Sequence, residues 1–299
     1  MKVLIAYDGS EQGDAALRDL LRAGLGEDVD ARVLNVAEVW VPPLEAVEGT
    51  TVWHEVMRDV RERAISELNR ATAVAGIAAD GLRDDFPKWE IKPEARAGPV
   101  AWSIIREAEQ WPADLVVVGA RGHAPLARLG IGGVALQVLT HLHCAVRVAR
   151  DSFEPRPVRI LVAVDGSLDA KAALDAVCAR KWPAESEARV ITVMEPRMLA
   201  NIAGASRSDV LSAEVQANAL ASSAARKLRQ HGLPVSQFVT TGNPRQVLLE
   251  QAQGFSADCI FLGARGLTRV ERFILGSVST SVAMQARCSV EVVHARPVT

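Results

Sequence analysis

The chain has 299 residues, of which 49% are hydrophobic and 23% are charged, and its formal net charge is -2. This composition is typical of a globular protein, and the length is sufficient for two domains that each bury a core. Because the charge is near zero and no basic run occurs, we do not expect a nucleic acid partner. No apolar stretch approaches the roughly 20 residues that cross a bilayer, so we expect no membrane association.

The N-terminal segment and the cysteines indicate the compartment. Asp8 follows the first apolar run too closely for a signal peptide. The four cysteines, Cys144, Cys178, Cys259 and Cys288, show no C-x-x-C spacing and suit a reducing environment. We therefore expect a cytoplasmic protein.

An internal repeat dominates the sequence. Met1-Lys-Val-Leu-Ile-Ala-Tyr-Asp8 returns 157 positions later as Val158-Arg-Ile-Leu-Val-Ala-Val-Asp165. A later motif, Ala113-Asp-Leu-Val-Val-Val-Gly119, returns 144 positions on as Ala257-Asp-Cys-Ile-Phe-Leu-Gly263. A repeat of this length is a whole domain, because solenoid units span only about 20 to 50 residues. We expect domains at 1–150 and 158–299, called copy one and copy two below, joined by a linker at 151–157.

Copy one alternates short apolar runs with helical patterns, which is typical of parallel strands joined by crossover helices. Its predicted strands are Lys2–Tyr7, Ala31–Val36, Ile91–Arg96, Leu115–Val118 and Ala145–Ala149. The drop in offset from 157 to 144 means that copy one carries 13 extra residues between its second and third strands. We expect these residues to lengthen a charged helix near Val52–Ala75 and the loop before it.

Copy two repeats the same order after a linker that Pro155 and Pro157 make short and stiff. Its predicted strands are Ile160–Val164, Val190–Val193, Ser236–Thr240, Cys259–Leu262 and Val290–His294. Its predicted helices are Asp169–Ala179, Ser208–Gln230, Arg245–Gln253 and Ser277–Gln285. The chain is therefore predicted to be an α/β protein of two tandem Rossmann-like domains, each a five-stranded parallel sheet with helices on both faces.

Three motifs of copy two fall at the carboxyl ends of predicted strands, where open parallel sheets bind ligands. Asp165 follows the first strand, Val193 ends the second, and Gly263-Ala-Arg-Gly266 closes the fourth. Gly263 and Gly266 lack a Cβ, so their backbone can take positive φ and can approach a ligand closely. The Asp165 carboxylate suits ribose hydroxyls or a bridging metal.

A fourth motif, Gly276-Ser277-Val278-Ser279, opens the last helix nine residues after Gly266. Amides at a helix N-terminus attract phosphate, and the Ser277 hydroxyl adds a donor. Three arginines of the preceding segment raise the local potential for an anion, namely Arg265, Arg269 and Arg272. Together the four motifs predict a nucleotide site.

The spacing Gly-x-x-Gly, nine residues, Gly-Ser resembles the motif of the ATP-binding universal stress proteins, here as a tandem of two domains. The resemblance covers both copies nearly end to end and implies the adenine nucleotide alpha hydrolase-like form of the fold. It implies ATP as the cofactor, with Mg²⁺ accompanying the phosphates. It implies a site built from Ala163, Val164, Asp165, Val193, Gly263, Arg265, Gly266, Gly276, Ser277, Val278 and Ser279.

The resemblance also implies roles and partners. Asp165 falls on the residue that contacts ribose, and the backbone of Val193 falls on the adenine contact. Members of this family pair through the last strand, which implies an intramolecular pseudo-dimer of the two copies. Two chains could associate further as a homodimer.

Copy one carries a weaker version of the motif. Its mates of the copy-two residues are Asp8, Val36, Gly119, Gly122, Gly132 and Gly133. Gly133 stands where copy two has Ser277, so the amide is kept and the hydroxyl is lost. One hydrogen bond to a charged group contributes roughly 1.5 to 3 kcal/mol, so we expect weaker or absent nucleotide binding in copy one.

Three classes of function remain open. The first is a nucleotide-binding stress-response or signalling module, and the second is an enzyme that hydrolyses ATP or transfers a phosphoryl group. The chain has no Gly-x-x-x-x-Gly-Lys-Ser/Thr loop and no lysine near its glycine motifs, so any hydrolysis is expected to be slow. No catalytic residue is assigned. The third is an interaction protein with a vestigial pocket.

Overall fold

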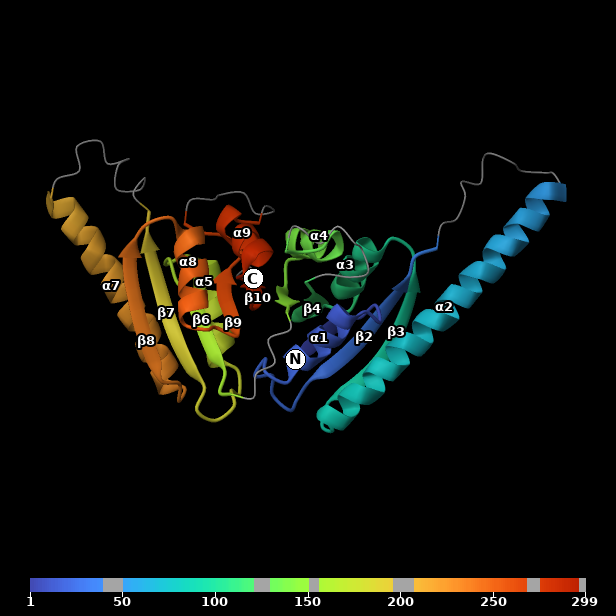
Figure 1. The fold of residues 1–299 in the computed structure, drawn as a ribbon, viewed down its shortest axis with the longest axis horizontal. Helices are drawn as coiled ribbons and strands as arrows, with labels where there is room; N and C mark the ends of the chain where they lie inside the picture. Colours follow the sequence, from blue (N-terminus) through green and yellow to red (C-terminus); the bar gives the residue numbers. More distant parts are fainter. Residues whose placement is uncertain (40–50, 121–129, 151–155, 196–206, 268–274, 296–299) are drawn as a thin grey trace.

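The computed structural model describes residues 1–39, 51–120, 130–150, 156–195, 207–267 and 275–295, with the backbone alone at 51–56 and 207–210. The two copies lie side by side, with sheet at the centre and a long helix on each outer flank (Figure 1). Of the predicted linker, residues 151–155 lie outside the described ranges. None of the described helices combines the length and apolar character needed to cross a membrane.

All ten predicted strands are present, which confirms the expected α/β fold. Copy one contributes β1 (Lys2–Ala6), β2 (Asp30–Ala37), β3 (Glu90–Ala97), β4 (Leu115–Gly119) and β5 (Ala145–Ala149). Copy two contributes β6 (Arg159–Ala163), β7 (Glu187–Met194), β8 (Val235–Thr241), β9 (Cys259–Gly263) and β10 (Ser289–Val293). The largest difference is at β7, which begins three residues before the predicted Val190.

The strands of both copies form one ten-stranded sheet in the order β3-β2-β1-β4-β5-β10-β9-β6-β7-β8. Neighbours within each copy run parallel, as predicted. The pair β5 and β10, called the seam below, runs antiparallel with Arg147 opposite Glu291. The seam satisfies the backbone groups of two edge strands that would otherwise be open to other chains.

Helices cover both faces of the sheet. Copy one contains α1 (Glu11–Leu20), α2 (Thr51–Asp85), α3 (Val100–Gln110) and α4 (Gly133–His141). Copy two contains α5 (Leu168–Cys178), α7 (Arg207–Gln230), α8 (Pro244–Gly254) and α9 (Ser277–Gln285). The helix α2 has 35 residues against 24 for its counterpart α7, so most of the extra length of copy one is helical. It runs ten residues beyond the predicted end at Ala75.

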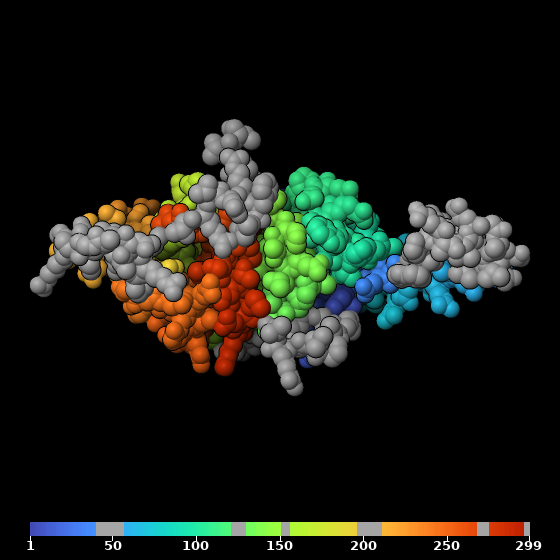
Figure 2. Space-filling model, turned by 90° about the horizontal axis from the view of Figure 1, so that it is seen from above, coloured from blue at the N-terminus to red at the C-terminus, as the bar shows by residue number. Residues whose placement is uncertain are grey.

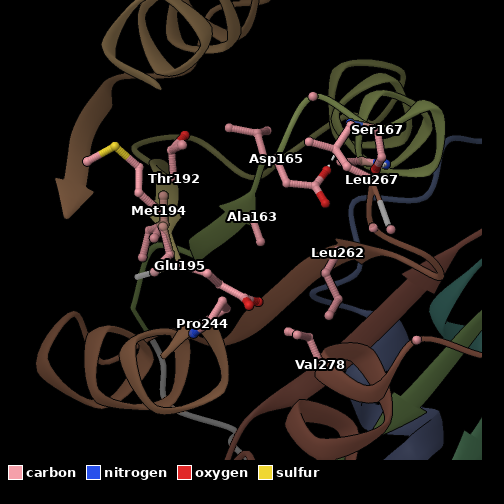
Figure 3. A pocket seen from close by; sticks show the side chains of 18 of the residues that line it. Ala163, Asp165, Ser167, Thr192, Met194, Glu195, Pro244, Leu262, Leu267 and Val278 are labelled. Atoms are coloured by element: carbon pink, nitrogen blue, oxygen red, sulfur yellow. Dashed lines mark hydrogen bonds between the residues drawn. The ribbon is translucent and has the colours of Figure 1, made fainter. Parts of the chain in front are cut away.

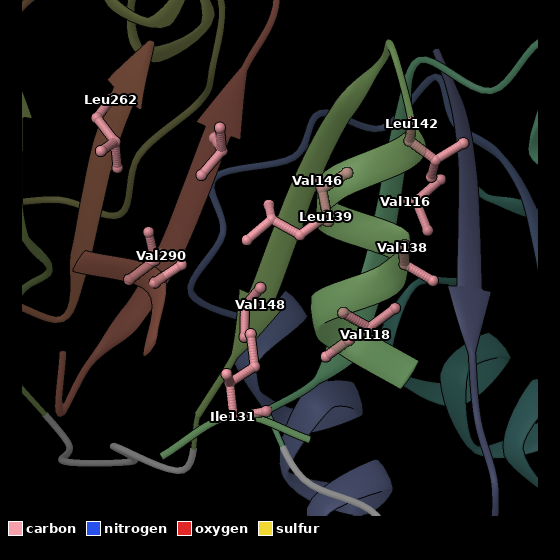
Figure 4. Packing of buried hydrophobic residues seen from close by; sticks show 14 of the residues in the cluster. Val116, Val118, Ile131, Val138, Leu139, Leu142, Val146, Val148, Leu262 and Val290 are labelled. Atoms are coloured by element: carbon pink, nitrogen blue, oxygen red, sulfur yellow. The ribbon is translucent and has the colours of Figure 1, made fainter. Parts of the chain in front are cut away.

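The buried apolar residues differ between the two faces. On the face covered by α3, α4, α8 and α9, a single cluster runs across the seam. Figure 4 shows Leu139, Val146 and Val148 of copy one next to Leu262 and Val290 of copy two. The opposite face has two separate clusters, one under α1 and α2 and the other under α5 and α7. The two copies therefore share one core layer.

A buried row of alternating charges crosses the opposite face of the seam. The Arg147 guanidinium donates to both carboxylate oxygens of Asp19 at 2.6 and 3.1 Å and to Glu291 at 3.2 Å. Arg180 bonds to the other oxygen of Glu291. The order of charges is Asp19, Arg147, Glu291, Arg180, and each of these side chains is at most 6% exposed. Although burial alone would lower the pKa of Arg147, Asp19 raises it well above its ordinary value.

Arg147 and Glu291 are repeat mates, separated by 144 positions. Each copy therefore contributes one sign of charge to the centre of the seam. Pairing β5 with a second β5 would place two Arg147 side chains together, and pairing β10 with β10 would do the same for Glu291. Such like-charge contacts in a buried site cost several kcal/mol, so the row favours the pairing of unlike copies.

Arg147→Met should lower the free energy of unfolding by about 3 to 5 kcal/mol, because Asp19 and Glu291 then stay buried without their shared cation. Urea denaturation of the full chain measures this change. The control is Arg70→Met, which breaks the exposed pair with Glu67 and should have little effect. Equal losses in the two variants would contradict this account of the seam.

Candidate functional site

A pocket of about 510 Å³ opens at the carboxyl ends of β6, β7 and β9. Helices α7, α8 and α9 complete its walls. Figure 3 shows side chains of β6, β7, β9, α8 and α9 around one open space. The eleven residues predicted in copy two all line it, namely Ala163, Val164, Asp165, Val193, Gly263, Arg265, Gly266, Gly276, Ser277, Val278 and Ser279. The fold therefore brings together motifs that lie up to 116 positions apart in the sequence.

Unpaired backbone of β7 forms one wall. The strand β6 pairs with β7 only as far as Ala163 opposite Ile191, where the Val164 N–H donates to the Ile191 carbonyl at 2.9 Å. Alternate residues of a strand direct their backbone groups to opposite neighbours. The N–H and C=O of Val193 therefore face the side of β6, beyond the end of that strand and towards the pocket. They can serve as a donor and an acceptor for a planar heterocycle.

The Asp165 carboxylate lies on the wall between β6 and β9. One oxygen accepts the Ser167 N–H at 2.9 Å, and the other would lie 2.9 Å from a Cβ added at Gly266. Gly266 therefore passes close against this carboxylate. The turn is fixed further because Ser167 donates its hydroxyl to the Arg265 carbonyl at 3.1 Å.

Although Gly263 and Gly266 are free to take positive φ, neither glycine does so. A Cβ at Gly263 would lie 2.5 Å from the Ala170 backbone nitrogen and 2.6 Å from the Asp169 carbonyl carbon. Gly263 is therefore required for the close approach of β9 to the first turn of α5. Positive φ occurs instead at Gly166, between Asp165 and the N-cap of α5.

The N-terminus of α9 has no side-chain cap, unlike those of α1, α5 and α8. Gly276 is the N-cap residue, and its own N–H donates to the Ala264 carbonyl at 2.7 Å. The amides of Ser277, Val278 and Ser279 follow, and the first turn of a helix has no intrahelical acceptors for them. With the helix dipole, these three amides form a site suited to an anion.

The two serines of this turn differ. Ser277 is exposed, and its hydroxyl makes no hydrogen bond to any described residue. Ser279 is 4% exposed, and its hydroxyl donates to the Gly263 carbonyl at 2.7 Å. The predicted Ser279 therefore lines the pocket but uses its hydroxyl proton to hold α9 against β9. Ser277 is the serine whose hydroxyl can reach a ligand.

Arg265 lines the pocket, but its guanidinium is held by Asp169. The two side chains form a bidentate ion pair at 2.7 and 3.0 Å, and Asp169 also accepts the Ala295 N–H at 2.9 Å. Burial would raise the pKa of Asp169, but the bonds from Arg265 and Ala295 lower it below its ordinary value. Arg265 thus carries less free positive charge than the sequence suggested. Arg269 and Arg272 lie outside the described residues.

Several lining residues were missed by the sequence reasoning. Glu195, at the end of β7, directs its carboxylate into the pocket on the wall opposite Asp165 (Figure 3). Gln216 and Leu220 of α7 and Pro244 and Leu248 of α8 add largely apolar surface. Glu195 could have been found from the repeat, because Glu38 occupies the same position in copy one. The helix contributions follow only from tertiary packing.

Copy one places its motif residues at the same edge of the sheet. Asp8 accepts the Ser10 N–H at 3.0 Å, Val36 lies in β2, Gly119 ends β4, and Gly132 is the N-cap of α4 without a side-chain cap. Gly133, the mate of Ser277, is exposed and has nothing within 4 Å of an added Cβ. The predicted Gly122 lies outside the described residues.

Gly263→Ala should lower the free energy of unfolding by about 1 to 3 kcal/mol, because its new methyl group overlaps backbone atoms of α5. The matched control is Gly76→Ala in the middle of α2, where an added Cβ meets nothing within 4 Å and should stabilise the helix. Thermal denaturation of both variants measures the difference. An unchanged melting temperature in Gly263→Ala would refute the close packing of β9 on α5.

Comparisons with known proteins find this architecture in universal stress proteins. A universal stress protein of Mycobacterium tuberculosis is 26% identical over 306 residues, which cover 96% of this chain and 95% of that protein. The crystal structure of a universal stress protein from Archaeoglobus fulgidus covers 99% of this chain and 98% of its own, with a TM-score of 0.60 and 24% identity. A universal stress protein solved in complex with cAMP covers 47% of this chain and 98% of its own, with a TM-score of 0.35 and 21% identity.

The sequence model of the universal stress protein family matches the chain twice, at residues 1–150 and at residues 158–294. Both copies are therefore matched separately by the same family. The matches together span more than half of the chain. This chain belongs to the universal stress protein family, in a tandem form.

Proposed function

We propose that the chain is an ATP-binding stress-response or signalling module whose nucleotide is held by copy two. The observation that carries this proposal is the uncapped N-terminus of α9, which opens into a pocket at the carboxyl edge of the sheet. The volume of about 510 Å³ is within the usual range for small-molecule sites. An adenine nucleotide matches the pocket in both its apolar and its polar parts.

The base and ribose are proposed to occupy the β7 side. The Val193 backbone offers a donor and an acceptor to the adenine edge, and Leu220 and Leu248 offer apolar surface to its faces. Asp165 is proposed to accept hydrogen bonds from the ribose hydroxyls. Glu195 and Asp165 are both negative, so the phosphates are favoured away from them, towards α9.

The phosphates are proposed to lie against the first turn of α9. The amides of Ser277, Val278 and Ser279 donate to them, with the Ser277 hydroxyl as a fourth donor. No group of three or more potential metal ligands occurs among the described residues. We therefore propose that Mg²⁺ arrives with the phosphates, which it binds while keeping much of its water.

Copy one is proposed to bind nucleotide weakly or not at all, and its pairing with copy two through the seam serves as an intramolecular pseudo-dimer. The seam already occupies the last strand of each copy, whereas β3 and β8 are the outer edges of the sheet. A further homodimer would therefore use another surface. Nucleotide occupancy of copy two would then bias the choice of partner.

Ser277→Gly, which converts copy two to the residue that copy one carries, should weaken ATP binding by about tenfold to a hundredfold through the loss of one hydrogen bond to a phosphate. Isothermal titration calorimetry of the full chain with ATP and Mg²⁺ measures the affinity. Gly133→Ser is the matched control in copy one and should leave the affinity of the copy-two site unchanged. Unchanged binding in Ser277→Gly would remove the phosphate assignment.

The module should hydrolyse ATP much more slowly than the rates of about 1 per second or more that are ordinary for enzymes. Release of inorganic phosphate from ATP by the purified chain tests this expectation. Fast turnover that Ser277→Ala abolishes would favour the phosphoryl-transfer enzyme instead. Failure of ATP to raise the melting temperature would favour the interaction protein with a vestigial pocket.

A further inference from the structure

Copy one holds the end of α9 that lies farthest from the pocket. Arg150 follows β5, and its side chain is 8% exposed. Its guanidinium donates to the carbonyls of Ala283 at 2.5 Å and Cys288 at 3.3 Å, across the seam, and to Gly130 of its own copy at 3.3 Å. Ala283 lies in the last turn of α9, where carbonyls lack intrahelical donors and a cation is favoured.

A second contact from copy one lies on the same turn. Gly130 has a φ of +71°, and a Cβ added there would lie 2.1 Å from the Met284 carbonyl oxygen. The backbone of copy one is therefore packed directly against the end of α9. The other end of α9 is held within copy two, through the Gly276 N–H to Ala264 and the Ser279 hydroxyl to Gly263.

Within the described residues, the position equivalent to Arg150 on the other side of the seam holds no arginine. The repeat mate of Arg150 is His294, and the helix equivalent to α9 is α4. The His294 ring meets His143, just beyond α4, edge to face at 6.1 Å, but its buried Nε2 has no hydrogen-bond partner. The pKa of His294 is lowered to about 4, chiefly by burial and also by Arg265 and His143, against an opposing effect of Asp169. At neutral pH the imidazole is therefore uncharged, and α4 receives no cation from copy two at this position.

We infer that Arg150 is a positioning residue for the phosphate site of copy two. It fixes the C-terminal turn of α9, and α9, a rigid rod of nine residues and about 13 Å, transmits that position to the three amides at its other end. Binding sites need their donors held within about 0.5 Å. The degenerate copy one thus completes the site of copy two, and this inference rests on the function proposed above.

The test compares two exchanges between repeat mates. In Arg150→His the full chain receives the residue that copy two carries, and in His294→Arg it receives the reverse. Titration calorimetry with ATP and Mg²⁺ gives the affinity, and amide hydrogen exchange of residues 276–286 reports the order of α9 without any nucleotide. Arg150→Lys, which keeps the charge but not the planar fork, is the conservative variant.

We expect Arg150→His to weaken ATP binding by about tenfold or more and to speed exchange in α9. We expect His294→Arg to stay within about twofold of the original chain, and Arg150→Lys to lie in between. If Arg150→His does not fold, Arg150→Lys carries the test, with the melting temperature confirming that it is folded. Unchanged affinity and unchanged exchange in the folded variant would overturn the inference.

The exchange measurement separates this inference from the proposed function. If the original chain binds no ATP, the proposed function fails, but faster exchange in Arg150→His still shows that copy one positions α9. If the original chain binds ATP and Arg150→His only lowers the melting temperature, Arg150 is structural and the positioning role fails.

Discussion

The seam between β5 and β10 is the constraint on which the rest of the structure depends. It joins two parallel half-sheets into one sheet, and it does so with a buried row of alternating charges from Asp19 to Arg180. Burying a charge costs free energy unless the charge is paired. The row therefore contributes more to the selection of which two strands pair at the seam than to the free energy of unfolding. Because Arg147 and Glu291 occupy equivalent positions, only unlike copies place opposite charges at the centre.

The two halves repeat one fold, and they differ at residues near the ends of their last helices. Copy two keeps the serine at the start of its last helix, and copy one keeps only the glycine. Copy one in turn has Arg150, whose side chain reaches across the seam to the end of α9. At the position equivalent to Arg150, copy two has His294. Each half therefore carries a residue whose counterpart is absent from the other half. The space-filling view shows the two halves in direct contact along the middle of the molecule (Figure 2).

Much of the fold and of the candidate site could be predicted from the sequence, because the repeat shows which residues belong to the fold. The sequence of strands along the chain and the edge where the motifs meet follow from β/α alternation, and the Ser277 to Gly133 exchange is visible in the aligned copies. Side-chain pairing could not be predicted, since Asp169 reaches Arg265 only through tertiary contact. The packing role of Gly263 could not be predicted, because a glycine required by helix packing and one required by a ligand look alike in sequence.

The most direct test of the central claim is a crystal structure of the full chain grown with ATP and Mg²⁺. The account predicts one nucleotide per chain in copy two, with its phosphates at the first turn of α9 and its base against the Val193 backbone. Phosphate density elsewhere, or a nucleotide bound only in copy one, would contradict it.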